Sequence, residues 1–358
     1  MPTPLLIGSC EPFSGKTVLL VGLARQLLQQ GVDLAVGKPL ATAPAHGDGL
    51  VDADVRFIGT TLGLAADRQI RSLQLIDSDD SQARLLSGNL SPGPGFAELQ
   101  RQIAHGDPQI VLLEAAGDLH EGLLQGLDLP QLAQGLDAPV VLVHPWVDAR
   151  SADQLLAAHQ QLGGRLVGVV LNGVDPDQLA DLRQRLEPAL ERLGLPVLGI
   201  LPRSPLLRSV TVAELVRRLQ ASVLCCHDST ELLVESLTIG AMNVNAAMEV
   251  FRRRRNMAVV TGADRTDIQL AALEASTQCL ILTGAGDPLP QLVNRAEELE
   301  VPLLKVDLDT LGTVEVIEAA FGHVRLHEPV KATHAIRLVE DHCQFARLFE
   351  RLGLPATT

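Results

Sequence analysis

The chain has 358 residues, of which 46% are hydrophobic and 2% aromatic, and its formal net charge is −14 at pH 7. This length predicts two domains, whereas the negative charge and the scarcity of aromatic rings disfavour nucleic acid as a partner. Because no apolar run reaches the roughly 18 residues of a membrane span and the N-terminus lacks a signal-peptide pattern, we expect a cytoplasmic protein with no membrane partner.

Residues 5–17 predict a strand, a phosphate-binding loop and the start of a helix. Cys10 occupies the usual place of the first glycine of G-x-x-x-x-G-K-[ST], so Gly8 supplies the glycine and the loop is longer. Loop N–H groups, the helix N-terminus and Lys16 can hold a polyphosphate, and the Thr17 hydroxyl can ligate Mg²⁺. An inert glycine turn is the alternative. The candidate nucleotide-binding residues here are Gly8, Ser14, Gly15, Lys16 and Thr17.

Two charged residues follow later strands at the edge where ligands bind in parallel sheets. Strand 33–40 presents Lys38, because a residue before a proline favours extended backbone. Lys38 is the candidate catalytic residue, and a surface lysine is the alternative. Strand 109–113 is followed by Glu114, the expected partner of Thr17 at a Mg²⁺ ion. Capping of a turn is the alternative for Glu114.

Two carboxylates and one amide complete the candidates of the first half. Asp52 and Asp54 could hold the metal directly or through water, although Asp52 could instead cap a helix. Asn172 ends strand 166–171, where its amide could read a purine edge or close a turn. Strands at 139–143 and 196–202 continue the alternation with helices, which predicts a parallel sheet covered by helices on both faces. The candidate metal ligands are Thr17, Asp52, Asp54 and Glu114.

The order of these motifs resembles the dethiobiotin synthetase fold. The resemblance rests on residues 8–17, Lys38 before a proline, residues 114–117 and Asn172 after a leucine, and it covers residues 1–220. It implies a loop that binds ATP, a Lys38 that contacts a carbamate-forming substrate and a Glu114 that helps hold Mg²⁺.

The second half, residues 221–358, predicts a smaller α/β domain with a C-terminal helix. Strand 257–261 leads into Asp264-Arg265-Thr266, which resembles the DRTGG domain, and strands 279–283 and 302–306 follow. Arg265 either holds an anion or forms a structural ion pair with a neighbouring carboxylate. If Arg265 holds an anion, a second ligand site is expected at Asp264, Arg265 and Thr266.

Together the halves resemble the N-terminal, non-catalytic region of long bacterial phosphotransacetylases. Because the chain ends at Thr358, we expect no acetyltransferase domain and no phosphate acetyltransferase activity. The resemblance implies an ATP–Mg²⁺-binding regulatory or scaffold protein that forms a homo-oligomer or binds a protein partner through its second domain.

An ATP-dependent ligase or carboxylase of the dethiobiotin synthetase type is the alternative function, and a structural descendant with an empty loop is a third. We expect slow turnover of ATP or none, since no water-positioning base or arginine finger is assignable. We also expect Thr17 and Glu114 to lie within about 10 Å of each other, near enough for one hydrated ion.

Overall fold

The structure, a computed structural model, describes residues 2–42 and 51–354. It divides into two compact units, Met1–Arg203 with Arg325–Thr358, and Ser204–Val324. The sequence placed the boundary at residue 220 and assigned all of 221–358 to the second domain. The structure differs at both points: residues 204–220 belong to the second unit, and the chain returns to the first unit at Arg325.

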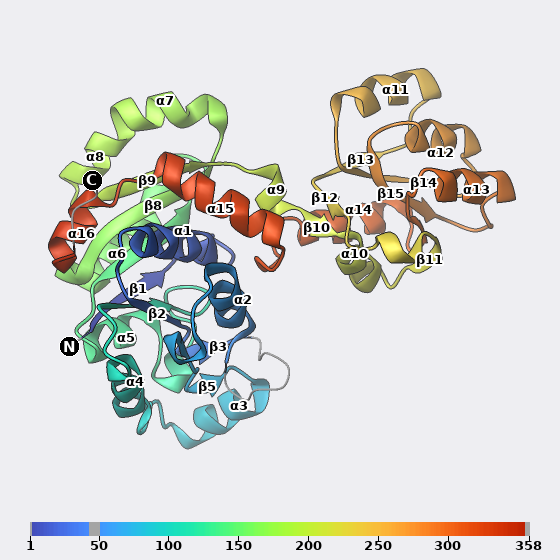
Figure 1. The fold of residues 1–358 in the computed structure, drawn as a ribbon. Coiled ribbons are helices and arrows are strands. Elements are labelled where there is room, and N and C mark those ends of the chain that lie inside the picture. Colours follow the sequence, from blue (N-terminus) through green and yellow to red (C-terminus); the bar gives the residue numbers. More distant parts are fainter. Residues whose placement is uncertain (1, 43–50, 355–358) are drawn as a thin grey trace. The chain divides into compact units, whose positions relative to one another are not determined.

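The first unit is built on a parallel sheet, as the sequence predicted (Figure 1). Seven strands of the described chain form it, and every pair is parallel. In spatial order they are β4 (Gln69–Ile70), β2 (Leu34–Gly37), β6 (Ile110–Glu114), β1 (Thr3–Gly8), β7 (Val140–Pro145), β8 (Leu166–Val174) and β9 (Val197–Pro202).

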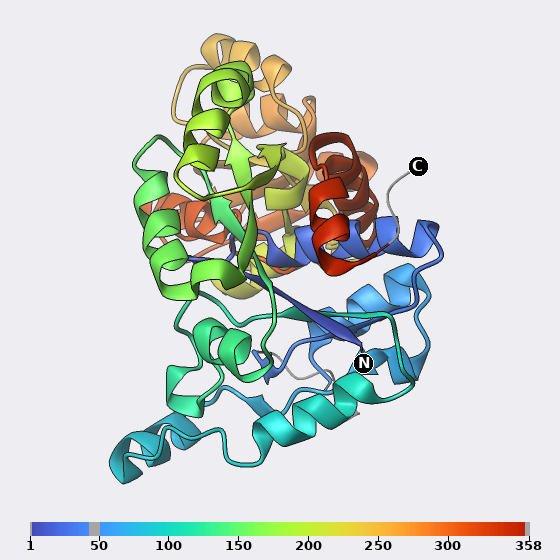
Figure 2. The same cartoon turned by 90° about the vertical axis from the view of Figure 1, so that its left-hand side faces the viewer.

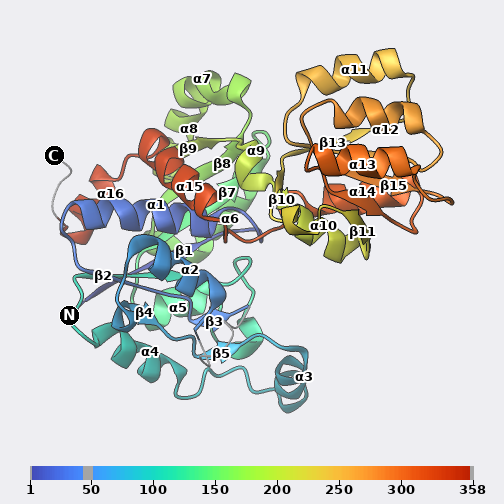
Figure 3. The same ribbon diagram turned by 45° about the vertical axis from the view of Figure 1, so that its right-hand side comes forward.

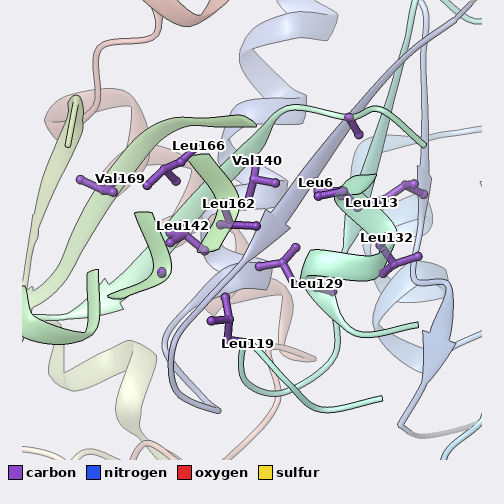
Figure 4. Close-up of a cluster of buried hydrophobic side chains, with 14 of the residues drawn as sticks. Leu6, Leu113, Leu119, Leu129, Leu132, Val140, Leu142, Leu162, Leu166 and Val169 are labelled. Atoms are coloured by element: carbon purple, nitrogen blue, oxygen red, sulfur yellow. The ribbon is translucent and has the colours of Figure 1, made fainter. Parts of the chain in front are cut away.

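Helices cover both faces of this sheet, because successive strand residues point to opposite sides. One face packs on helices α4 to α8 through a leucine- and valine-rich core, part of which Figure 4 shows. The other face carries α1, α2 and α15 (Figures 1 and 2). The bounds are α1 (Lys16–Gln29), α2 (Ala53–Leu62), α4 (Gly95–Ala104), α5 (Leu129–Gly135), α6 (Ser151–Leu162), α7 (Leu179–Asp181), α8 (Glu187–Arg192) and α15 (Pro329–His342).

Helix α15 belongs to the first unit because it packs closely along α1. The contact is tight at Gly22, where an added Cβ would lie 2.4 Å from the Cβ of Val339. The buried face of α15 repeats at helical spacing, and Cys343 then bridges to Gly199 of β9 before α16 (Ala346–Leu352) begins. The sequence showed the helix but not its partner.

The predicted smaller α/β domain is present in the second unit (Figure 3). Its main sheet is parallel apart from β11, which pairs antiparallel with β16. One face packs on α11, α12 and α13, and the opposite face packs on α10 and α14. The place of α10 in this core explains why residues 204–220 belong here. The spatial order is β11 (Ser222–Cys225), β16 (Leu303–Lys305), β15 (Thr277–Thr283), β14 (Met257–Gly262) and β13 (Ser236–Ile239). The helices are α10 (Val212–Leu219), α11 (Val244–Arg253), α12 (Thr266–Leu273), α13 (Pro290–Glu298) and α14 (Thr310–Ala320).

Further short strands and helices lie between these elements. They are β3 (Leu40–Ala41) paired with β5 (Gln74–Leu75), β10 (Val210–Thr211) paired with β12 (Leu233–Val234), α3 (Ser78–Ser87) and α9 (Pro205–Arg208). None of the helices in the described ranges combines the length and apolar composition that crossing a bilayer demands.

Candidate functional site

The loop between β1 and α1 has the backbone of an anion-binding turn. Gly15 is the N-cap residue of α1 and has a φ of 98°, a conformation that favours glycine. A Cβ at this position would lie 2.4 Å from the Nδ2 atom of Asn172, so the glycine is also required by space. Because glycine carries no side chain to accept hydrogen bonds, the first N–H groups of α1 can serve a phosphate.

Lys16 is almost fully buried beside this turn. Its ammonium donates to the Ser9 hydroxyl at 3.0 Å and to the carbonyl oxygen of Gly117. Burial lowers the pKa of Lys16, and the nearby Glu114 carboxylate opposes this shift. The loop after β1 and the loop after β6 therefore each supply one acceptor that holds the lysine. These two residues, Ser9 and Gly117, were not among the residues predicted from the sequence.

Thr17 and Glu114 meet directly. The Thr17 hydroxyl donates to Oε1 of Glu114 at 3.1 Å, which confirms the predicted proximity of these two residues. Glu114 is 4% exposed, and its Oε2 atom has no hydrogen-bond partner among the described residues. Burial raises the pKa of Glu114, while the ammonium of Lys38 opposes the shift. A buried carboxylate oxygen without a partner is costly, so a cationic ligand there is physically favourable.

Lys38 lies among three carboxylates at the end of β2. Its Nζ atom is 2.6 Å from Asp54, 3.6 Å from Asp52 and 4.0 Å from Glu114, and it donates to the Thr42 hydroxyl at 3.0 Å. Burial alone would lower the pKa of Lys38, but the three carboxylates outweigh it and raise that pKa. Lys38 is thus a buried ion-pair partner and not a surface lysine.

The two aspartates have different roles. Asp52 caps α2, because its side chain accepts from the backbone N–H of Asp54 at 2.9 Å and from that of Thr42 at 3.0 Å. The capping alternative for Asp52 is therefore observed. Asp54 contacts Lys38 and two residues that sequence reasoning missed, Arg325 at 3.1 Å and His327 at 3.2 Å.

The surroundings of Asp54 favour its charged form. Burial would raise the pKa of Asp54, but His327, Lys38 and Arg325 together hold it well below its usual range. Arg325 and His327 follow more than 270 residues later in the chain. No local pattern could have revealed them, although the apolar stripe of the following helix signalled that this segment packs on another element.

Asn172 and Gly8 shape the loop from outside. The Asn172 amide donates to the Ser14 carbonyl at 2.7 Å, and its Oδ1 atom accepts from the Gly173 N–H at 2.8 Å. The amide therefore braces the loop, in line with the turn-closing alternative. A Cβ at Gly8 would lie 2.2 Å from the side chain of Leu129, so this glycine permits packing against α5. Ser14 is 1% exposed, and its hydroxyl lacks a partner in the part of the chain that the structure describes.

A pocket of about 320 Å³ opens beside the loop. It is lined by Pro12 from the loop and by Asp118, His120 and Glu121 from the segment after β6. Within residues 2–42 and 51–354, no three His, Cys, Asp or Glu side chains lie close enough to bind a metal ion by themselves. A divalent ion at this edge would need the Thr17 hydroxyl, phosphate oxygens or water as further ligands.

The candidate residues of the second unit lie in the turn between β14 and α12. Arg265 is 3.4 Å from Asp267 and donates to the carbonyl oxygen of Met242 at 2.9 Å. Thr266 is the first residue of α12, and Asp264 precedes Arg265 in the turn. This arrangement contains the ion pair that the sequence offered as one reading, and it tethers the turn to the segment before α11.

Two family models match the chain. The AAA domain matches residues 3–211, and the DRTGG domain matches residues 214–320. Among curated proteins, the phosphate acetyltransferase of Synechocystis sp. is 25% identical over 376 residues, covering 98% of this chain and 52% of the relative. The phosphate acetyltransferase of Nitrosomonas europaea is 24% identical over 361 residues, covering 95% of this chain and 50% of the relative. The chain therefore spans about half the length of the curated relatives it matches.

Solved structures give weaker likenesses. The CBS and DRTGG domains of the regulatory region of Clostridium perfringens pyrophosphatase, complexed with the activator diadenosine tetraphosphate, are 13% identical. That match covers 43% of this chain and 74% of the other, with a TM-score of 0.29. The MinD cell division protein of Aquifex aeolicus is 13% identical, and the match covers 57% of this chain and 84% of MinD with a TM-score of 0.35. Neither TM-score supports a functional conclusion.

Proposed function

We propose that this chain is a nucleotide-binding regulatory or scaffold protein. The chain belongs to the AAA domain family and matches the N-terminal part of long phosphotransacetylases. In this proposal the first unit binds ATP with Mg²⁺ through residues 8–17. The second unit either senses a ligand or mediates assembly in the cytoplasm. Its partner in assembly is a second copy of the chain or another protein.

The bond between Thr17 and Glu114 is the observation that carries the proposal. It joins the first turn of α1 to the tip of β6 at 3.1 Å and leaves the second Glu114 oxygen without a partner among the described residues. The hydroxyl of Ser14 is a second buried polar group that lacks a hydrogen-bond partner among the described residues. These groups, the uncapped start of α1 and the buried Lys16 ammonium fit a polyphosphate with its cation.

In this proposal, different residues bind the phosphate groups and the metal ion. Lys16 and the loop N–H groups would hold phosphate oxygens, and Thr17 and Glu114 would hold Mg²⁺ directly or through water. The bound Mg²⁺ neutralises phosphate charge. The Lys38 ammonium is paired with carboxylates, and the sequence assigns neither a water-positioning base nor an arginine finger, so we expect slow turnover of ATP or none.

The proximity of Lys38 to this region supports a ligase as a second candidate. Its ammonium lies 4.0 Å from Glu114, which is itself bonded to Thr17. An anionic acceptor that displaced Asp54 from Lys38 would lie near a transferring phosphoryl group. Release of ADP on adding candidate amines and bicarbonate would support this candidate over a regulatory role.

The test is the effect of Mg²⁺ on binding of a fluorescent ATP analogue to the full chain. Glu114→Gln keeps the Oε1 acceptor for Thr17 but removes the charge, so it should lose most of the gain in affinity that Mg²⁺ gives the wild type. Its affinity without Mg²⁺ should change little. Glu340→Gln, at an exposed position of α15, is the matched control. An equal gain from Mg²⁺ in wild type and Glu114→Gln would exclude Glu114 as a metal-holding residue.

A further inference from the structure

The segment that returns from the second unit ends on the candidate nucleotide site. This return segment, residues 325–328, directly follows Val324, the last residue of the second unit. Arg325 Nη1 lies 3.1 Å from Oδ2 of Asp54, and His327 Nε2 lies 3.2 Å from Oδ1. Both oxygens of a carboxylate that is 7% exposed are therefore contacted from this one segment.

Packing and further hydrogen bonds fix the return segment in place. Arg325 also donates to the hydroxyl of Thr42 at 3.0 Å, and Leu326, which follows it in the chain, is buried. The His327 ring lies 5.6 Å from the ring of Phe57 on α2. The segment is thus anchored to α2 and to the end of β3, and α15 continues from it along α1.

These contacts help to hold the Lys38 ammonium between the carboxylates of Asp54 and Glu114. The Lys38 ammonium shares Oδ2 of Asp54 with Arg325 and stands 2.6 Å from Asp54 and 4.0 Å from Glu114. A cation positioned between two carboxylates occupies space that a hydrated divalent ion at the same carboxylates would need. Asp54 is one of the candidate metal ligands, so a divalent ion that used it beside Glu114 would compete with Lys38 for its carboxylate. Whatever fixes Asp54 on Lys38 therefore opposes the divalent ion.

We propose that the return segment is a latch, in which Arg325 and His327 hold Asp54 on Lys38 and so oppose binding of the Mg²⁺-loaded nucleotide. This inference rests on the proposed function of the first unit. Binding of nucleotide with Mg²⁺ releases Arg325 from Asp54. Because Arg325 is joined covalently to the second unit, the latch is also a route along the chain by which that unit can regulate the nucleotide site.

The experiment measures the Mg²⁺ concentration at half-maximal effect on nucleotide binding to the full chain. Arg325→Gln removes the charge and should lower this midpoint by about three- to tenfold, the change expected from loss of one partly buried ion pair. Arg325→Lys, which keeps the charge, should stay within about twofold of the wild type. Arg337→Gln, on the exposed face of α15, is the matched control and should leave the midpoint unchanged.

Hydrogen exchange provides a readout that does not depend on affinity. Peptides covering residues 325–328 should exchange faster in the wild type when ATP and Mg²⁺ bind, and faster in Arg325→Gln even without ligand. An unchanged or raised midpoint in Arg325→Gln, with nucleotide binding intact, overturns the latch alone. Absence of nucleotide binding by the wild type overturns the latch and the proposed function together.

Discussion

Substitution of Gly22 should separate α15 from α1 and destabilise the first unit. An alanine Cβ would lie 2.4 Å from the Val339 Cβ and 2.6 and 2.7 Å from its two methyl carbons. Carbon atoms in contact prefer about 3.5–4.0 Å, so the two helices must move apart by about 1 Å. Overpacking costs about 1–3 kcal/mol, and replacing a helical glycine by alanine returns about 1 kcal/mol.

The expected result is a graded loss of stability. Gly22→Ala should lower the free energy of unfolding by about 1 kcal/mol, and the bulkier Gly22→Leu by about 3 kcal/mol. Urea unfolding followed by circular dichroism measures both. Gly164→Ala is the control, because an added Cβ there meets no atom of the described residues within 4 Å and should change the unfolding free energy by less than about 0.5 kcal/mol. Unchanged stability in Gly22→Leu would refute the close packing of α15 on α1.

Two further substitutions test the ion pairs and the loop. Asp54→Asn removes the carboxylate nearest to the buried Lys38 ammonium and should cost about 3 kcal/mol near neutral pH. Because the folded pKa of Asp54 is depressed, this difference in unfolding free energy from wild type should persist above about pH 5 and shrink as the pH falls below about 4, where the unfolded carboxyl protonates. Urea unfolding between pH 3 and 7 measures the difference. A difference that stays constant over this range would contradict the depressed pKa. Asn172→Ala removes the donor to the Ser14 carbonyl and should lower the unfolding free energy by about 1 kcal/mol and weaken nucleotide binding. Exposed Asn294→Ala is its control, and equal nucleotide affinities would exclude bracing of the loop by Asn172.

Local patterns were sufficient to predict the sheet and the core of the candidate site. Apolar runs located the main strands, and their polar ends placed Glu114 beside Thr17 because parallel strands end at one edge. The same reasoning brought Lys38 to this edge. It did not distinguish a substrate-binding lysine from an ion-paired one, since that depends on the carboxylates that surround Lys38 in three dimensions.

The path of the chain after the second unit could not be predicted in the same way. The helix at 329–342 is visible as a periodic apolar stripe, but nothing in its sequence states which element it covers. Its partner is Gly22 on α1, more than 300 residues earlier. Arg325 and His327 were missed for this reason, because their contact with Asp54 exists only once α15 packs on the first unit.

Calorimetric titration of the full chain with ATP and Mg²⁺ tests the central claim most directly. The account predicts a saturable binding heat for the wild type and a much weaker one for Lys16→Ala, which loses the buried ammonium beside the loop. Circular dichroism spectra should match, to show that both proteins are folded. Equal heats for the two proteins, or no heat from the wild type at millimolar ATP, would contradict a nucleotide site at residues 8–17.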